Sequence, residues 1–96
     1  MDHAAILSRK SLAIHALMAR FRVSNPRLFG SVLRGTHGAQ SDIDILVDPM
    51  PGTTLFDLGG LQIELEDLLG CPVDLVTPRD LPLQIRRDVL AEARAL

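Results

Sequence analysis

The stretch that decides the fold begins Gly30-Ser31-Val32-Leu33-Arg34-Gly35 and resumes at Ser41-Asp42-Ile43-Asp44-Ile45-Leu46-Val47. Ten residues, 32–41, separate the Gly-Ser pair from the first aspartate. The second half is rich in β-branched residues and alternates at its start, which predicts a strand over 42–48. Because side chains alternate between the faces of a strand, the two aspartates share one face and the isoleucines supply the core.

Two carboxylates on one strand face gain nothing from folding, but they suit a divalent cation. Hard oxygen ligands of this kind favour Mg²⁺. Asp74 interrupts the apolar stretch 73–76, and if that stretch is a strand beside 42–48, three carboxylates converge. Three carboxylates can hold two ions, the arrangement used in nucleotidyl transfer. The alternative for Asp42 and Asp44 is an ordinary solvated strand face, and Asp48 is expected to be a strand-end residue rather than a ligand.

The Gly-Ser pair supplies the complementary half of such a site. A glycine at a strand end lets a phosphate approach the backbone. If a helical turn starts at Ser31, its free N–H groups and the hydroxyl face the phosphates. Arg34, one turn further on, could pair with a phosphate oxygen. The predicted nucleotide-binding residues are therefore Gly30, Ser31 and Arg34.

The remaining pattern alternates helices with strands. Apolar residues at helical spacing predict one amphipathic helix over 4–22, ended by Ser24-Asn25-Pro26. A short strand is expected at 27–30, and a helix capped by Thr53 or Thr54 and stopped by Gly70. A strand at 73–77 and a helix over 83–95 follow. These elements predict an α/β (α+β) domain with a small sheet.

Composition further limits the class of protein. The chain has 96 residues, 47% of them hydrophobic, which fits a single domain over 1–96 and excludes disorder. No apolar run reaches the ~18 residues of a membrane-spanning helix. The absence of a signal pattern and a single cysteine, Cys71, lead us to expect a cytoplasmic protein with an unreactive, buried thiol.

The net charge of −2 conceals an uneven distribution. Residues 1–34 carry six bases and one acid, whereas residues 35–78 carry eight acids and no Lys or Arg. A block of this kind repels polyanions unless cations neutralise it, so we expect no direct nucleic-acid binding. Thr36 stands where a P-loop needs Lys, and no Cys or His spacing suits zinc.

The Gly-Ser pair, the ten-residue interval and Asp-x-Asp together resemble the minimal nucleotidyltransferase domains of the polymerase-beta-like superfamily. The stretch Val73-Asp74-Leu75-Val76 is similar to that family's later strand with the third carboxylate. The resemblance implies a nucleotidyltransferase fold, a small mixed sheet flanked by helices. It also implies that Asp42, Asp44 and Asp74 are catalytic and bind Mg²⁺, with two ions, and that ATP is the substrate.

Stand-alone domains of this family often act as antitoxins of a HEPN-domain toxin, and some transfer AMP to a tyrosine of that toxin. The resemblance therefore implies a HEPN partner in a hetero-oligomer. This chain contains no Tyr, so a tyrosine acceptor must lie on another molecule. Two alternatives stay open at this point: a non-catalytic antitoxin that inhibits its partner by complex formation, and a nucleotidyltransferase that acts on a small molecule.

Overall fold

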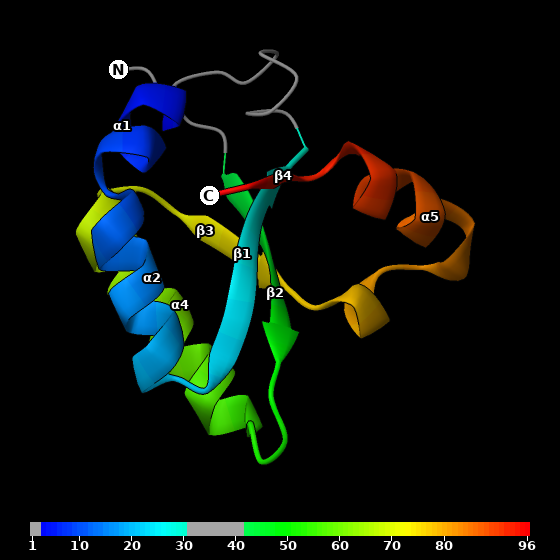
Figure 1. Ribbon diagram of the computed structural model, residues 1–96, viewed down its shortest axis with the longest axis horizontal. Helices are drawn as coiled ribbons and strands as arrows, with labels where there is room; N and C mark the ends of the chain where they lie inside the picture. Colours follow the sequence, from blue (N-terminus) through cyan, green and yellow to red (C-terminus); the bar gives the residue numbers. More distant parts are fainter. Residues whose placement is uncertain (1–2, 31–41) are drawn as a thin grey trace.

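A mixed sheet with the order β3-β2-β1-β4 organises the computed structural model, which describes residues 3–30 and 42–96 (Figure 1). Its strands are β1 (Val23–Phe29), β2 (Ile43–Pro49), β3 (Val73–Val76) and β4 (Arg94–Ala95). β1 is antiparallel to both β2 and β4, whereas β2 and β3 are parallel. The predicted small mixed sheet flanked by helices is therefore confirmed.

Three helices cover one face of the sheet: α1 (His3–Arg9), α2 (Ser11–Arg20) and α4 (Leu55–Leu69) (Figure 1). The side chains of α2 and α4 meet those of the central strand in one buried cluster, in which Ile14, Leu61 and Ile45 are fully buried. The short helix η1 (Pro78–Asp80) and α5 (Leu83–Glu92) lie on the other side of the molecule. Within the described residues, no helix is both long and apolar enough to span a membrane.

The prediction of a single helix over 4–22 is wrong, because the helix breaks at Lys10. There the backbone leaves helical geometry, with φ −102° and ψ 13°. The Lys10 ammonium donates a hydrogen bond to the carbonyl of Leu68, near the C-terminal end of α4, at 2.6 Å. A cation in this position satisfies a free helix-end carbonyl and complements the helix dipole. The break thus ties α1 and α2 to α4.

The prediction that Ser24-Asn25-Pro26 ends the preceding helix is also wrong, because these residues lie inside β1. α2 already ends at Arg20, and Arg22 adopts a positive φ. The register of β1 against β2 shifts between Ser24 and Arg27, and Asn25 has φ 54°. A proline lacks the N–H that a strand needs, but a bulge tolerates it. Pro26 is fully buried there, and its carbonyl accepts a bond from Leu96 N.

The helix predicted over 83–95 ends early, at Glu92. The next residues, Arg94 and Ala95, pair with β1 as the short edge strand β4. An unpaired edge of β1 would expose its backbone groups, and β4 covers part of that edge. This helix is not part of the core, since α5 contributes no buried residue.

The ends of α4 are the ones that the sequence predicts. Thr54 is the N-cap and forms a capping box with Asp57, with the two bonds at 3.1 and 2.9 Å. Gly70 ends the helix in the left-handed conformation, with φ 73°. Of the two adjacent glycines inside α4, only Gly60 is needed for close packing.

We expect Gly59→Ala and Gly60→Ala to have opposite effects on stability. A Cβ at Gly59 would meet nothing within 4 Å, so alanine should raise the free energy of unfolding by about 0.5–1 kcal/mol. A Cβ at Gly60 would lie 2.8 Å from Cε1 of Phe21, so overpacking should lower it by about 1 kcal/mol. Urea unfolding measures both, and equal effects would contradict the packing described here.

Candidate functional site

A row of three side-chain positions crosses the open face of the sheet at one end of β2. Asp44 pairs with Asp74 of the parallel strand β3 on one side and with Phe29 of β1 on the other. Neighbouring strands lie about 4.8 Å apart, so the two aspartates are close neighbours. Their sequence neighbours Ile43 and Val73 are buried in the core, so the carboxylates belong to the opposite face. The structure therefore places Asp44 beside Asp74, as the sequence predicts.

Asp42 lies just before β2, two residues from Asp44, and its side chain is exposed. The chain is fixed at this point by a bond from Ile43 N to the carbonyl of Pro72, at 3.0 Å. The three aspartates thus approach the same end of β2 and β3. In residues 3–30 and 42–96, no three His, Cys, Asp or Glu side chains form a group that could hold a metal ion.

Of the three residues predicted to bind phosphate, the structure describes Gly30, which follows β1 directly. It has φ 78°, a conformation that favours glycine. A Cβ at this position would overlap the carboxylate oxygen Oδ2 of Asp44 and lie 3.0 Å from its Cγ. The absence of a side chain at Gly30 therefore lets the Asp44 carboxylate lie directly against the backbone at the end of β1. Ser31 and Arg34 lie outside the described residues.

A cleft of about 460 Å³ opens next to Asp44, between the sheet and α5. Phe29, Gly30 and Asp44 form its sheet side. Four residues of α5 form the opposite side: Ile85, Asp88, Val89 and Glu92. Sequence reasoning missed these last residues as site candidates, because their spacing reads equally well as an ordinary amphipathic helix. Ile85 and Val89 border this cleft and are not buried in the core.

Cys71, directly before β3, is partly buried and lies near the same end of the sheet. Burial raises the pKa of its thiol, and the negative charges of Glu66 and Asp42 raise it further. A raised pKa keeps the thiol protonated and a weak nucleophile. The expectation that Cys71 is unreactive fits this environment.

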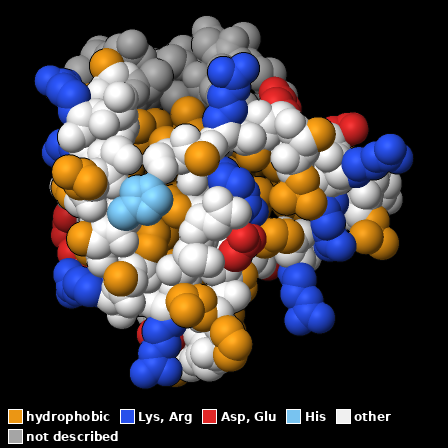
Figure 2. Space-filling view, viewed as in Figure 1, with side chains coloured by type: hydrophobic (Ala, Val, Ile, Leu, Met, Phe, Trp, Pro, Cys, Tyr) orange, Lys and Arg blue, Asp and Glu red, His pale blue; other side chains and the backbone are white. Residues whose placement is uncertain are grey.

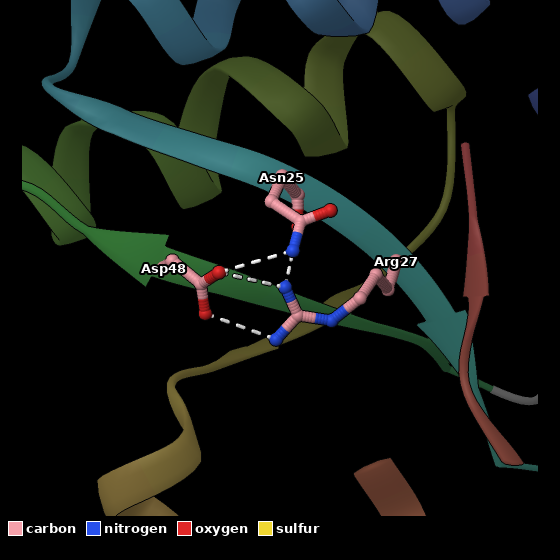
Figure 3. Close-up of polar contacts among 3 residues, drawn as sticks. All are labelled: Asn25, Arg27 and Asp48. Atoms are coloured by element: carbon pink, nitrogen blue, oxygen red, sulfur yellow. Dashed lines mark hydrogen bonds and ion pairs between the residues drawn. The ribbon is translucent and has the colours of Figure 1, made fainter. Parts of the chain in front are cut away.

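The open face of the sheet also carries an ion pair, at the far end of β2 from Gly30 (Figure 3). Arg27 donates two hydrogen bonds to Asp48, one to each carboxylate oxygen, both at 3.0 Å. Asn25 donates a third to Asp48 at 3.0 Å and accepts one from Arg27 through its carbonyl. The bond from Arg27 is the main cause that lowers the pKa of the Asp48 carboxyl. Asp48 is thus a structural strand-end residue, as expected.

We expect Asp48→Asn to lower the free energy of unfolding at pH 7 by about 1 kcal/mol. The Asp48 side chain is 41% exposed, which screens the pair, but the Arg27 side chain is only 12% exposed and would lose its counter-charge. Since folding lowers the pKa of Asp48, this stabilisation is present at neutral pH and is lost as the pH falls below about 4.

Urea unfolding at pH 7 and pH 3 checks this expectation. The difference between wild type and the variant should shrink at the lower pH. Asp67→Asn, at an exposed position on α4, is the control and should be nearly neutral. A difference that is the same at both pH values would contradict the assigned pair.

Comparison with known proteins shows which family has this fold. A family model described as nucleotidyltransferase domain matches residues 13–96. Protein adenylyltransferase MntA of Thermococcus cleftensis is 42% identical over 76 residues, which are 79% of this chain and 77% of the relative. A solved structure, provisionally described as a minimal nucleotidyltransferase, matches with a TM-score of 0.83 and 40% identity, over 100% of this chain and 95% of that one.

A second solved structure, a toxin–antitoxin with AMP-PNP, matches with a TM-score of 0.68 and 27% identity, over 83% of this chain and 66% of that one. Together, the mixed sheet, the paired aspartates and the glycine beside them define a nucleotidyltransferase fold. The chain belongs to the nucleotidyltransferase domain family and is a nucleotidyltransferase.

Proposed function

We propose that this protein is a Mg²⁺-dependent protein adenylyltransferase that acts as the antitoxin of a toxin–antitoxin pair. It transfers AMP from ATP to a tyrosine hydroxyl of a HEPN-type toxin and so neutralises the toxin. The observation that carries the proposal is the pairing of Asp44 with Asp74 next to Gly30, whose backbone the Asp44 carboxylate approaches closely. The relative named protein adenylyltransferase and the toxin–antitoxin structure with AMP-PNP support the reaction and the kind of partner.

The chemistry of the donors suits Mg²⁺, although in the described residues the three aspartates are not gathered into one group that could hold a metal ion. Carboxylate oxygens are the ligands that Mg²⁺ prefers, and Asp44 and Asp74 are adjacent in register. The Asp44 carboxylate takes up the space that a Cβ at Gly30 would need, so this carboxylate lies against the backbone at the end of β1. Asp42, Asp44 and Asp74 would hold the metal. Bound Mg²⁺ would offset the negative charge of the triphosphate and of the leaving pyrophosphate.

The residues of the chain have distinct tasks in this reaction. Gly30 admits the triphosphate to the strand end, with Ser31 and Arg34 as the proposed further contacts. The acceptor oxygen forms a bond to the α-phosphorus, and the bond from that phosphorus to the bridging oxygen of pyrophosphate breaks. Asp74 is exposed at the edge of the row, and its proposed further role is to help take the proton from the acceptor hydroxyl.

The acceptor must lie on another molecule if it is a tyrosine, because this chain has none. A separate partner that supplies the acceptor is also what a toxin–antitoxin pair provides. The protein is proposed to work in the cytoplasm as a hetero-oligomer with that toxin, without direct contact to nucleic acid.

A second candidate is an antitoxin that inhibits its partner by complex formation alone. One observation favours it: in the described part of the chain, the aspartates do not form a three-ligand metal group. The first candidate remains preferred, because complex formation gives no reason for Asp44 and Asp74 to pair across neighbouring strands beside a positive-φ glycine.

The test is transfer of label from ATP to a HEPN-type toxin, which is to be sought among the products of the neighbouring genes. With Mg²⁺ present, ATP labelled on the α-phosphate should label the toxin, whereas ATP labelled on the γ-phosphate should not. Removal of Mg²⁺ with EDTA should abolish labelling. If the toxin is inhibited while no label is transferred, complex formation is the function and the enzymatic proposal is wrong for this partner.

A further inference from the structure

The outward face of α4 carries two large apolar side chains that the core does not use. Phe56 is 91% exposed and Ile63 is 61% exposed, whereas Leu61 and Leu65 on the inward face are fully buried. A helix has about 3.6 residues per turn, so Phe56 and Ile63 lie close to two turns apart and share one face. Two such side chains on one exposed face are typical of a surface that packs against another protein.

Gly59 lies on the same outward face, between these two side chains. A Cβ at this position would meet nothing within 4 Å, so no contact inside the described part of the chain requires a glycine there. A glycine inside a helix costs about 1 kcal/mol relative to alanine. Its benefit is a gap between two bulky residues, into which a second helix can pack closely. Phe56, Gly59 and Ile63 are called the α4 stripe below.

The two ends of α4 carry opposite charges. Near its N-terminal end, Nη1 of Arg22 lies 3.5 Å from the position of a Cβ at Gly52, and Figure 2 shows a basic side chain beside hydrophobic ones at this end, at the bottom of the view. Asp67 is exposed in the last turn, where the helix dipole disfavours a negative charge. In the part of the chain that the structure describes, neither Arg22 nor Asp67 forms an ion pair. Lys10, which is near Asp67, is bonded to the carbonyl of Leu68.

We propose that α4 is the interface of a symmetric dimer, in which the α4 helices of two copies pack antiparallel along the α4 stripe. Antiparallel packing centred at Gly59 places Phe56 of each copy against Ile63 of the other, because these two residues lie almost equally far from that centre. The same packing brings Arg22 of each copy toward Asp67 of the other. The two faces therefore match in both shape and charge, which favours a second copy as the occupant.

This dimer leaves the reaction site accessible. α4 covers one face of the sheet, whereas the carboxylates of Asp44 and Asp74 belong to the opposite face. Figure 1 shows α4 and α5 on opposite sides of β1 and β2. Dimerisation along α4 thus gives an assembly with two reaction sites that face away from each other. The inference goes beyond the proposed function, and neither depends on the other.

Sedimentation equilibrium of the full chain tests the dimer. The mass should rise from that of one chain toward that of two as the concentration increases from about 1 to about 500 µM, the range of a small interface. Phe56→Ser should raise the dimer Kd at least ~30-fold and Ile63→Ser at least ~10-fold. Both side chains are exposed, so the variants should fold. Leu83→Ser is the matched control, because Leu83 on α5 is also apolar and 76% exposed, and it should not change Kd.

A charge exchange tests the antiparallel direction. Arg22→Glu and Asp67→Lys should each raise Kd about fivefold, and the two substitutions in one chain should restore it to within about twofold of wild type. Parallel helices would not place these residues together, so no restoration would occur. Gly59→Ala should raise Kd at least ~3-fold and yet stabilise the chain against urea at concentrations where it is monomeric. A glycine with no role at an interface would show only the second effect.

Two results would overturn the proposal. The first is a chain that stays monomeric over the whole range, even if the α4 stripe then proves to bind a toxin or another protein. The second is a dimer that Phe56→Ser and Ile63→Ser leave unchanged, because another face then joins the copies. The proposed function is tested separately: a wild-type dimer that transfers no label contradicts the proposed function alone, and a monomer that transfers label contradicts the dimer alone.

Discussion

Asp44→Asn is expected to lower nucleotidyl transfer at least ~100-fold without unfolding the protein. The substitution keeps the size and shape of the side chain but removes the charge that lies between Asp74 and Phe29 in the sheet. Loss of one group that stabilises charge in a transition state typically costs ~100- to 1,000-fold in rate. Asp44 is also only half-buried, so the amide can be solvated and the fold should persist.

The matched control is Asp48→Asn, which makes the same change on the same strand face four residues away. Asp48 is bound to Arg27 and lies away from Gly30, so its variant should retain transfer activity despite a small loss of stability. Label transfer and urea unfolding should be measured on both variants. Asp44→Asn transferring label within threefold of wild type would show that this carboxylate does not serve the reaction.

Asp74→Asn should resemble Asp44→Asn in activity and differ in pH dependence. If Asp74 receives the proton from the acceptor, the slow residual reaction of its variant should speed up as the pH rises and the acceptor hydroxyl ionises. The residual activity of Asp44→Asn should not gain in the same way. This comparison separates metal binding from proton transfer within one row of side chains.

The sequence was sufficient for the parts of the fold in which local signals and burial agree. β2 alternates strictly between core residues and carboxylates at its start, and α4 has both a capping box and a left-handed C-cap. The sequence predicted the pairing of Asp44 with Asp74 only on the condition that 73–76 lies beside β2, and the structure meets that condition.

Elements whose form depends on distant partners could not be predicted. Pro26 is a reliable local breaker, yet the bulge in β1 accommodates it, and Leu96 from the other end of the chain binds its carbonyl. The break at Lys10 depends on Leu68, 58 residues away in the sequence. The α5 residues that line the cleft are of the same kind, since their spacing alone cannot distinguish a core face from the wall of a cleft.

The second large effect is expected for Gly30→Ala. A side chain there has two separate costs, one in backbone conformation and one in steric overlap with Asp44. Alanine there would have to adopt φ 78°, and its Cβ would overlap the Asp44 carboxylate. The backbone cost alone is about 1–2 kcal/mol. The overlap must be relieved by moving Asp44 or the strand end. We therefore expect Gly30→Ala to destabilise the protein and to lower transfer activity by at least ~10-fold even where it remains fully folded.

Gly70 provides the control, because it has nearly the same backbone conformation without the crowding. Its φ is 73°, and a Cβ there would meet nothing within 4 Å. Gly70→Ala should therefore cost about 1–2 kcal/mol of unfolding free energy and leave transfer activity unchanged. Urea unfolding and label transfer on the two variants separate the effect of backbone strain at a positive φ from the effect of moving the Asp44 carboxylate. If both variants lose the same stability and neither loses activity, the close approach of Asp44 to Gly30 has no part in the reaction.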